Sequence, residues 1–389
     1  MRLCPWMWFL SGLVCLIVFC TRVFFLLHIT SVFSQGKILM SKRVAIIGAG
    51  IVGLHTAIAF RIKGWEVYLM DKESYTGHHT STRNSGVVHA GIYYKEDSLK
   101  EKLCLRGNPL TLEWLKLLNV DHKSCGKWII PGMNQNQSDL LAFYEKIKTL
   151  PLKGLRYVDP DQLKIEEPAL KRTAALFVPA TAVMDTAAYI RALSRFAENE
   201  GVNLLLNCEL TEVKDDLIVT SRGPLEADLF INSTGLMAAK VAQLVGVTGY
   251  EVRPCRGDYY LLPVSPVSKP VYHPPSQSGS LGLGIHLTPA TDGTLLLGPN
   301  AFFIDNPEDY AHKSPQEAFV ETLRDHLPEA NPDSLVPAYS GNRPKLTYQG
   351  QPLADFTFIK DKNWIHLLGI ESPGLTSAPV IGSYILGMV

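Results

Sequence analysis

The stretch that decides the fold is VAIIGAGIVGLHTAIAFRIKGWEVYLMDKE, residues 44–73. An apolar run, a glycine-rich turn, a helix-like segment and a second apolar run ending on an acid predict a strand–helix–strand unit. Gly48 permits the tight turn, Gly50 lets backbone N–H groups approach a pyrophosphate, and Gly53 lets helix and strand pack closely. Asp71 follows the second strand, where a carboxylate can accept the ribose hydroxyls of an adenosine. The stretch therefore predicts a dinucleotide site, and a purely structural turn is the alternative.

Length and charge narrow the class of protein. A chain of 389 residues can bury a large core and is expected to hold two domains, one of them discontinuous. The 37 basic and 37 acidic residues balance, so no nucleic-acid partner is predicted. The seven cysteines show no CxxC spacing and the sequence no His-rich spacing, which predicts neither a metal site nor a disulfide framework. We expect ordinary buried thiols of a reducing compartment at Cys104, Cys125, Cys208 and Cys255.

The first 40 residues differ from the rest of the chain. Residues 3–21 carry no charge, are rich in Leu, Val, Phe and Trp, and are flanked by Arg2 and Arg22. This apolar length can cross a bilayer, so a membrane anchor is one interpretation. A targeting segment without an evident cleavage site is another, and a segment absent from the mature protein, which would begin near Met40, is the preferred one. The catalytic part is expected in the cytoplasm, with or without membrane association through residues 3–21.

The order of the elements predicts an α/β fold in which one domain interrupts another. Strand–helix patterns recur along the chain, and they alternate with β-rich segments that Pro and Gly break. The predicted parts are a hydrophobic N-terminal segment at 1–40, a Rossmann-like domain at 41–124, 181–249 and 341–389, and a mixed β-sheet substrate domain at 125–180 and 250–340.

Local patterns predict single elements. Leucines at helical spacing predict a helix over 97–119, and residues 314–328 are also expected to be helical. Residues 158–170 read as a helix that Asp159 or Asp161 caps. The turn Thr291–Gly293 between two apolar runs predicts a hairpin.

A specific resemblance begins at TSTRNSGVVHAGIYYKEDSLKEKLCLRGN, residues 80–108. The chain resembles the flavin-dependent L-2-hydroxyglutarate dehydrogenase/oxidase family, which belongs to the larger glycine/D-amino-acid oxidase group. Further matching stretches are KWIIP at 127–131, VMDTAAYIRAL at 183–193, RGDYYLL at 256–262, GIHLTPATDGTLLLGPNA at 284–301, GNRPKL at 341–346 and GIESPGLTSAPVIG at 369–382. Together these stretches lie within residues 43–385 and follow the order of the family.

The resemblance implies FAD as the cofactor, bound mostly by the Rossmann-like domain. It assigns the diphosphate to Gly48, Gly50 and Gly53 and the adenosine ribose to Asp71, where many relatives have Glu. The residues expected to wrap the isoalloxazine and ribityl chain are Thr80, Ser81, Asn84 and Ser85. Val213 is expected at the adenine, and Ser233, Thr234 and Gly235 along the diphosphate. The residues that begin the last helix are Ser372, Pro373, Gly374, Leu375 and Thr376, and the positive end of that helix would stabilise negative charge on the flavin.

Oxidation of a 2-hydroxy acid needs a cation for the carboxylate and a base for the hydroxyl. Arg343 and Arg256 are the candidate cations, because the planar guanidinium matches a carboxylate in bidentate fashion; surface salt bridges are the alternative. His89 and His286 are the candidate bases, because imidazole titrates near neutral pH; satisfied structural histidines are the alternative. Tyr259 is expected to close the pocket. His78 and His79 are expected to be loop residues rather than points of covalent flavin attachment.

The expected reaction is oxidation of L-2-hydroxyglutarate, or a similar 2-hydroxy acid, to the 2-oxo acid with FAD as hydride acceptor. Electrons would then pass to oxygen, a quinone or an electron-transfer carrier. An amine oxidase of the glycine/sarcosine type and a glycerol-3-phosphate dehydrogenase are alternatives on the same fold. A membrane-bound flavin redox sensor without turnover is the alternative from another class.

Overall fold

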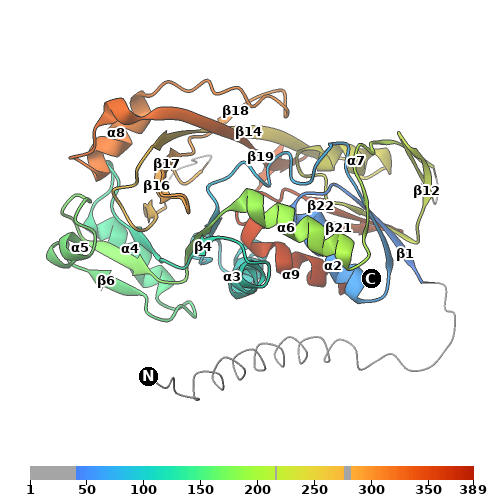
Figure 1. Ribbon diagram of the computed structural model, residues 1–389, viewed down its shortest axis with the longest axis horizontal. Helices are drawn as coiled ribbons and strands as arrows, with labels where there is room; N and C mark the ends of the chain where they lie inside the picture. Colours follow the sequence, from blue (N-terminus) through green and yellow to red (C-terminus); the bar gives the residue numbers. More distant parts are fainter. Residues whose placement is uncertain (1–40, 215–216, 276–281) are drawn as a thin grey trace, which may run out of the picture. The chain divides into compact units, whose positions relative to one another are not determined.

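The computed structural model describes residues 41–214, 217–275 and 282–389 (Figure 1). The apolar residues 3–21, considered above as an anchor or leader, lie outside these ranges. Within the described ranges, no helix combines the length and the apolar character that crossing a bilayer requires.

A six-stranded sheet carries the predicted strand–helix–strand unit, with the order β21-β22-β13-β1-β2-β9. Its elements are β1 (Arg43–Ile47), α2 (Ile51–Ile62), β2 (Glu66–Met70), β9 (Asn203–Leu205), β13 (Leu229–Asn232), β21 (Thr357–Asp361) and β22 (Trp364–Leu368). β1 pairs in parallel with both β2 and β13, and β22 is parallel to β13, whereas the edge strand β21 is antiparallel. The parallel pairs confirm the Rossmann-like fold that the sequence predicts.

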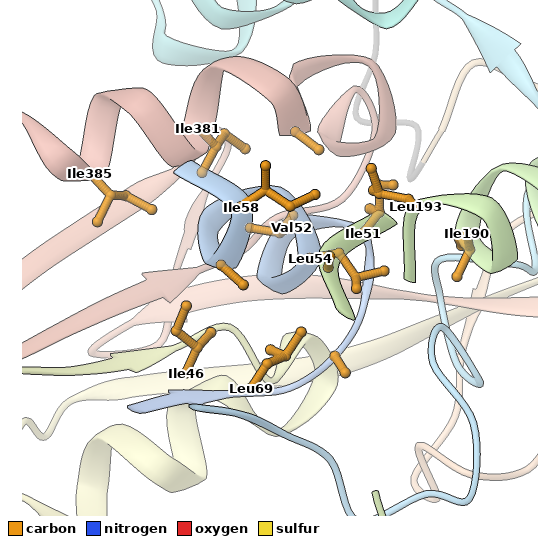
Figure 2. Packing of buried hydrophobic residues seen from close by; sticks show 14 of the residues in the cluster. Ile46, Ile51, Val52, Leu54, Ile58, Leu69, Ile190, Leu193, Ile381 and Ile385 are labelled. Carbon is orange, nitrogen blue, oxygen red and sulfur yellow. The ribbon is translucent and has the colours of Figure 1, made fainter. Parts of the chain in front are cut away.

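Helices cover this sheet with a continuous apolar core. They include α3 (Leu99–Leu117), α6 (Thr186–Asn199) and α9 (Gly374–Leu386), and α2 contacts both α6 and α9. Figure 2 shows Ile58 of α2 near Ile381 of α9, with Ile46 and Leu69 of the sheet below the same helix. All four side chains are at most 2% exposed. Burial of these aliphatic side chains fixes the helix that begins at the glycine-rich turn.

A second, mixed sheet has the order β20-β19-β14-β17-β16-β15-β5-β7-β6, and β18 also pairs with β14. Its strands are β5 (Lys127–Ile129), β6 (Arg156–Val158), β7 (Ala175–Val178), β14 (Tyr250–Leu262), β15 (Val271–Tyr272), β16 (His286–Pro289), β17 (Leu295–Gly298), β18 (Phe302–Phe303), β19 (Val336–Tyr348) and β20 (Gln351–Leu353). β15 and β5 are parallel and the other pairs are antiparallel. β19 runs through the expected boundary at residue 341, and residues Lys42–Val389 form one compact unit. The division into two domains therefore stays a prediction.

The remaining elements are short. Two three-stranded sheets contain β3 (Val87–Val88), β8 (Ala182–Met184) and β4 (His122–Lys123), and β10 (Leu210–Lys214), β11 (Leu217–Thr220) and β12 (Gly223–Glu226). The helical segments are α4 (Gln137–Ile147), α5 (Pro160–Glu166), η1 (Gly235–Met237), α7 (Ala238–Leu244), α8 (Glu317–His326) and η2 (Pro332–Ser334). In Figure 1, α4, α5 and α8 lie at the opposite end of the described chain from α2 and α7.

Caps and turns explain several of the predicted boundaries. Asp159, rather than Asp161, caps α5, because its carboxylate accepts the backbone N–H groups of Asp161 and Gln162 at 2.9 Å. The helix ends at Glu166, before Pro168, as proline requires of the residues that precede it. The predicted hairpin is confirmed as β16–β17, with Gly293 at φ 92° in its turn.

Candidate active site

Hydrogen bonds hold the glycine-rich turn in place, and neighbouring backbone packs so closely against it that side chains would not fit at its glycines. The Asp71 carboxylate accepts the Ala49 N–H at 2.7 Å, and the Ser81 hydroxyl accepts the Ile51 N–H at 3.0 Å. A Cβ at Gly48 would lie 2.6 Å from the Ser233 carbonyl oxygen, and one at Gly53 would lie 2.0 Å from the Gly48 carbonyl oxygen. Bare backbone is therefore required where β1 meets α2.

Two cavities with shared walls extend from this turn. Their volumes are about 490 and 190 Å³. The residues that line both are Gly50, Thr80, Ser81, Ser233 and Gly235. The smaller cavity adds Gly48, Asp71 and Thr234, and the larger adds Asn84, Ser85, Ser372, Pro373, Gly374 and Leu375. Segments that are far apart in the sequence thus bring most of the predicted cofactor residues to one elongated space.

Three predicted cofactor residues lie outside the lining of both cavities. Gly53 sits at the helix–strand contact, where its role is packing. Val213 belongs to β10 and packs in an apolar cluster with Ile218 and Phe230. Thr376 is fully buried inside α9, where its hydroxyl accepts the His89 N–H at 3.0 Å. Packing against neighbouring elements, which depends on the tertiary structure, places these three residues away from the cavity surface.

Both candidate histidines line the larger cavity, and Tyr272 lies between them. The Tyr272 ring stacks on His286 with a centroid distance of 3.9 Å and meets His89 edge-on at 6.4 Å. His89 Nε2 lies 3.2 Å from the hydroxyl of Ser372, just before α9. His286 Nδ1 lies 3.0 Å from the Gly284 carbonyl, which can only accept, so Nδ1 donates and Nε2 keeps its lone pair.

The histidines are held in the neutral form. Burial lowers the pKa of His286 to about 3, and the positive charge of Arg343 acts in the same direction. Burial also lowers the pKa of His89 to about 3, with a further contribution from the Lys127 charge. A neutral imidazole near a ligand cavity can accept a proton at neutral pH.

The two candidate arginines have different surroundings. Arg343, on β19, lines the larger cavity, and its guanidinium contacts the Asn300 carbonyl oxygen at 3.1 Å and the Cys255 sulfur at 3.8 Å. No ion pair in the described part of the chain includes Arg343, so its charge is uncompensated. Arg256 is fully buried, lies outside the lining of both cavities, and pairs with an Asp309 carboxylate oxygen at 2.8 Å. The structure thus brings Arg343, and not Arg256, to the histidines, because Arg256 is engaged by an acid 53 positions away that the sequence pattern did not indicate.

The larger cavity contains a second charged group that the sequence analysis did not identify, formed by Lys100, Lys345 and Glu371. Lys100 and Lys345 place their ammonium groups 2.9 Å from the Glu371 carboxylate. Burial alone would raise the pKa of Glu371, but the two lysines hold it below its usual value. Together with Arg343 the group leaves the cavity wall positive. Lys345 stands two positions after Arg343 on one strand. Alternate residues of a strand share a face, so this spacing was the sequence signal that could have placed Lys345 beside Arg343.

Tyr259, which was expected to close the pocket, also lines the larger cavity, and its hydroxyl lies 3.1 Å from that of Ser85.

The side chains of Glu73, His78 and His79 lie together, with possible ligand atoms within 4.8 Å of one another, and the two histidines line the smaller cavity. His79 is hydrogen-bonded on both sides, to the Glu73 carboxylate at 3.0 Å and to the Tyr310 hydroxyl at 2.8 Å. The Lys72 ammonium lies 3.4 Å from the same carboxylate, so a divalent cation would have to displace it. The geometry is that of a hydrogen-bonded network at the wall of the cavity.

Comparisons with known proteins agree with this geometry. The family model described as FAD dependent oxidoreductase matches residues 43–387. The chain is 32% identical to a mitochondrial L-2-hydroxyglutarate dehydrogenase of Arabidopsis thaliana, over 87% of this chain and 82% of that protein. It is 25% identical to L-2-hydroxyglutarate dehydrogenase of Escherichia coli K12, over 88% of this chain and 92% of that protein. Among solved structures, L-alpha-glycerophosphate oxidase of Mycoplasma pneumoniae with bound FAD superimposes with a TM-score of 0.78 at 22% identity, covering 90% of this chain and 94% of that one.

Proposed function

This chain belongs to the FAD dependent oxidoreductase family and uses FAD, and we propose that it oxidises L-2-hydroxyglutarate, or a similar short 2-hydroxy acid, to the 2-oxo acid. The names of the two relatives, at 32% and 25% identity over most of this chain, support that substrate. The chemistry of the larger cavity supports it independently.

The residues around the two cavities fit the cofactor. Gly48 and Gly50 leave bare backbone where a Cβ would collide with Ser233 or Ser81, as the close approach of a diphosphate requires. Asp71 lines the smaller cavity and offers a carboxylate to the adenosine ribose. Gly374 and Leu375, at the start of α9, line the larger cavity and would face the ring system. Bound FAD supplies an acceptor for the hydride that leaves the hydroxyl-bearing carbon.

The single observation that carries the proposal is the uncompensated charge of Arg343 in the same cavity as two neutral histidines. An arginine without an acidic partner favours an anionic ligand, and its planar guanidinium can bind a carboxylate through two hydrogen bonds. The cluster of Lys100, Lys345 and Glu371, with two ammonium groups to one carboxylate, adds a net positive charge that suits a second carboxylate. A dicarboxylic 2-hydroxy acid satisfies both groups.

The histidines provide the proton chemistry. With the carboxylate held by Arg343, the substrate hydroxyl gives its proton to a neutral imidazole as the carbon is oxidised. His286 presents the Nε2 lone pair, because Nδ1 is bonded to the Gly284 carbonyl. His89 presents Nε2 beside Ser372. The buried rings of Tyr259 and Tyr272 line this end of the cavity and present apolar surface to it.

Anaerobic addition of substrate to the purified, FAD-loaded protein tests the proposal. L-2-Hydroxyglutarate should bleach the visible absorption band of the oxidised flavin, whereas sarcosine and glycerol 3-phosphate should leave it unchanged. Bleaching by sarcosine or glycerol 3-phosphate alone would replace the proposal with the corresponding alternative. Failure of every substrate in a panel of 2-hydroxy acids would favour a flavin protein without turnover.

A further inference from the structure

A buried lysine stands beside Tyr272, the ring that lies between the two histidines, and has no acidic partner among the described residues. Lys127 lies in β5, is fully buried, and its Nζ has no hydrogen-bond partner among the described residues. Its ammonium lies 4.6 Å from the centre of the Tyr93 ring and 4.8 Å from that of Tyr272. A buried ammonium without an acid or hydrogen bond is costly, and a methionine or leucine would fill the same space without that cost. The position therefore indicates a role beyond packing.

The rings that surround Lys127 connect it to both histidines. Tyr272 is in contact with the ammonium through its face, stacks on His286 at 3.9 Å and meets His89 at 6.4 Å. Tyr93 is held in place by its hydroxyl, which donates to the His273 carbonyl at 2.9 Å. An ammonium over two phenol rings gains cation–π attraction and restrains both rings.

The titratable groups that face Lys127 come from every element around it. Cys104 belongs to α3, Tyr93 and His89 to the loop between β3 and α3, and Tyr272 to β15. None of these groups carries a negative charge at neutral pH, because burial raises the pKa of the Cys104 thiol to about 12 and holds the pKa of the Tyr272 hydroxyl well above its usual value. Burial lowers the pKa of Lys127 itself to about 7, and Cys104 opposes this weakly. A protonated Lys127 therefore lowers the pKa of His89, and none of these groups offers a negative charge to offset the effect.

We propose that Lys127 is a positioning residue for proton transfer: it fixes Tyr272 between His89 and His286, and its positive charge adds to the effect of burial in disfavouring the imidazolium form of His89. The assignment of the histidines as proton acceptors rests on the proposed function. The effect of Lys127 on His89 is an electrostatic property of the folded chain, and it can be measured whether or not hydroxyglutarate is the substrate.

The test compares Lys127→Met with Lys127→Arg in the FAD-loaded protein, with Lys123→Met as a matched loss of an exposed lysine. Imidazole titration by nitrogen-15 NMR should show the His89 midpoint about one pH unit higher in Lys127→Met. Lys127→Arg and Lys123→Met should leave it in place. The acid limb of kcat/KM with hydroxyglutarate should move by the same amount and only in Lys127→Met. The melting temperature of Lys127→Met should be unchanged or higher, because an unpaired buried charge is removed.

An unshifted His89 midpoint in Lys127→Met, together with a lower melting temperature, would reduce Lys127 to a structural residue and overturn the proposal. If Lys127→Met does not fold, Lys127→Arg still tests the proposal. A rise of one pH unit in the His89 midpoint of Lys127→Arg, which keeps the positive charge, would also overturn the proposal. Absence of hydroxyglutarate turnover in the unmodified protein, with the His89 shift intact, would overturn the proposed substrate and leave the coupling of Lys127 to His89 standing.

Discussion

The two ends of the cavity system are built in opposite ways. At the cofactor end, the part of the wall that would face a diphosphate is the bare backbone of the glycine-rich turn, which Asp71 and Ser81 hold by accepting N–H groups at 2.7 and 3.0 Å. At the substrate end, the wall is side chains, and His89, His286 and Arg343 come from three segments far apart in the sequence. The comparison teaches that the cofactor end depends on the absence of side chains, whereas the substrate end depends on their identity. Substitutions at the cofactor end should therefore reduce FAD binding and folding, whereas substitutions at the substrate end should reduce turnover or substrate affinity.

The largest effect is expected at the cofactor end. Gly53→Ala places a Cβ 2.0 Å from the Gly48 carbonyl oxygen, a distance that backbone cannot accommodate without moving α2. We expect loss of bound FAD and of most folded protein, measured as the flavin-to-polypeptide ratio and the melting temperature. Gly64→Ala is the control, because nothing lies within 4 Å and only its φ of 84° is unfavourable, at about 1–2 kcal/mol. Stoichiometric FAD in Gly53→Ala would remove the distinction between the two ends.

Next in size is the loss of a proton acceptor at the substrate end. His89→Gln and His286→Gln should each retain FAD, and the variant that removes the base should lose about 100- to 10,000-fold in kcat. His55→Gln is a matched control, because His55 is also buried but bonds the Tyr189 hydroxyl at 2.8 Å in the core of the other region. It should lower the melting temperature and leave kcat within a few fold. Equal kcat in all three variants would show that neither predicted histidine is the base.

Arg343 and Arg256 give a smaller and sharper contrast. Arg343→Gln should raise KM for hydroxyglutarate by roughly 10- to 100-fold, as loss of a charge-assisted contact predicts, without lowering the melting temperature. Arg256→Met should lower the melting temperature and leave KM unchanged, because it leaves the Asp258 carboxylate buried without its cation. Steady-state kinetics and thermal unfolding of both variants test whether Arg343 acts on substrate binding and Arg256 on stability. An unchanged KM in Arg343→Gln would withdraw that residue from the substrate site.

The smallest effect on catalysis is expected from a property that both regions share, the dependence of stability on pH. Burial lowers the pKa of His55 and His286 to about 3 and that of His273 to about 4, all below the value of about 6.5 in an unfolded chain. The unfolded state therefore takes up protons first, so stability is full above about pH 6.5 and falls as the pH decreases towards 4. Each imidazole contributes up to about 1.4 kcal/mol per pH unit in that window. Urea unfolding from pH 7.5 to 4.5 should show the decline, and His55→Gln should make it shallower. A stability that stays constant across this range would contradict the buried, neutral state of these rings.

Local sequence determined the cofactor end. The glycine spacing, the apolar strands on either side and the acid at position 71 are neighbours in the chain, so turn geometry and periodicity alone predicted the unit that β1, α2 and β2 form. The cap at Asp159 and the β16–β17 hairpin followed from equally short-range rules.

Only the tertiary structure decided the substrate end. Arg343 and Arg256 both lie in glycine-containing strand segments, yet pairing of β14 with β19 turns one towards the cavity and leaves the other beside Asp309. Lys100 meets Glu371 across 271 positions. Tyr272 stacks on His286 because β15 and β16 are neighbours in the mixed sheet, and His89 meets the same ring from the loop that follows β3. The physical reason is that glycine and apolar periodicity act over one turn or one strand, whereas burial and charge pairing depend on which distant segments the core brings together.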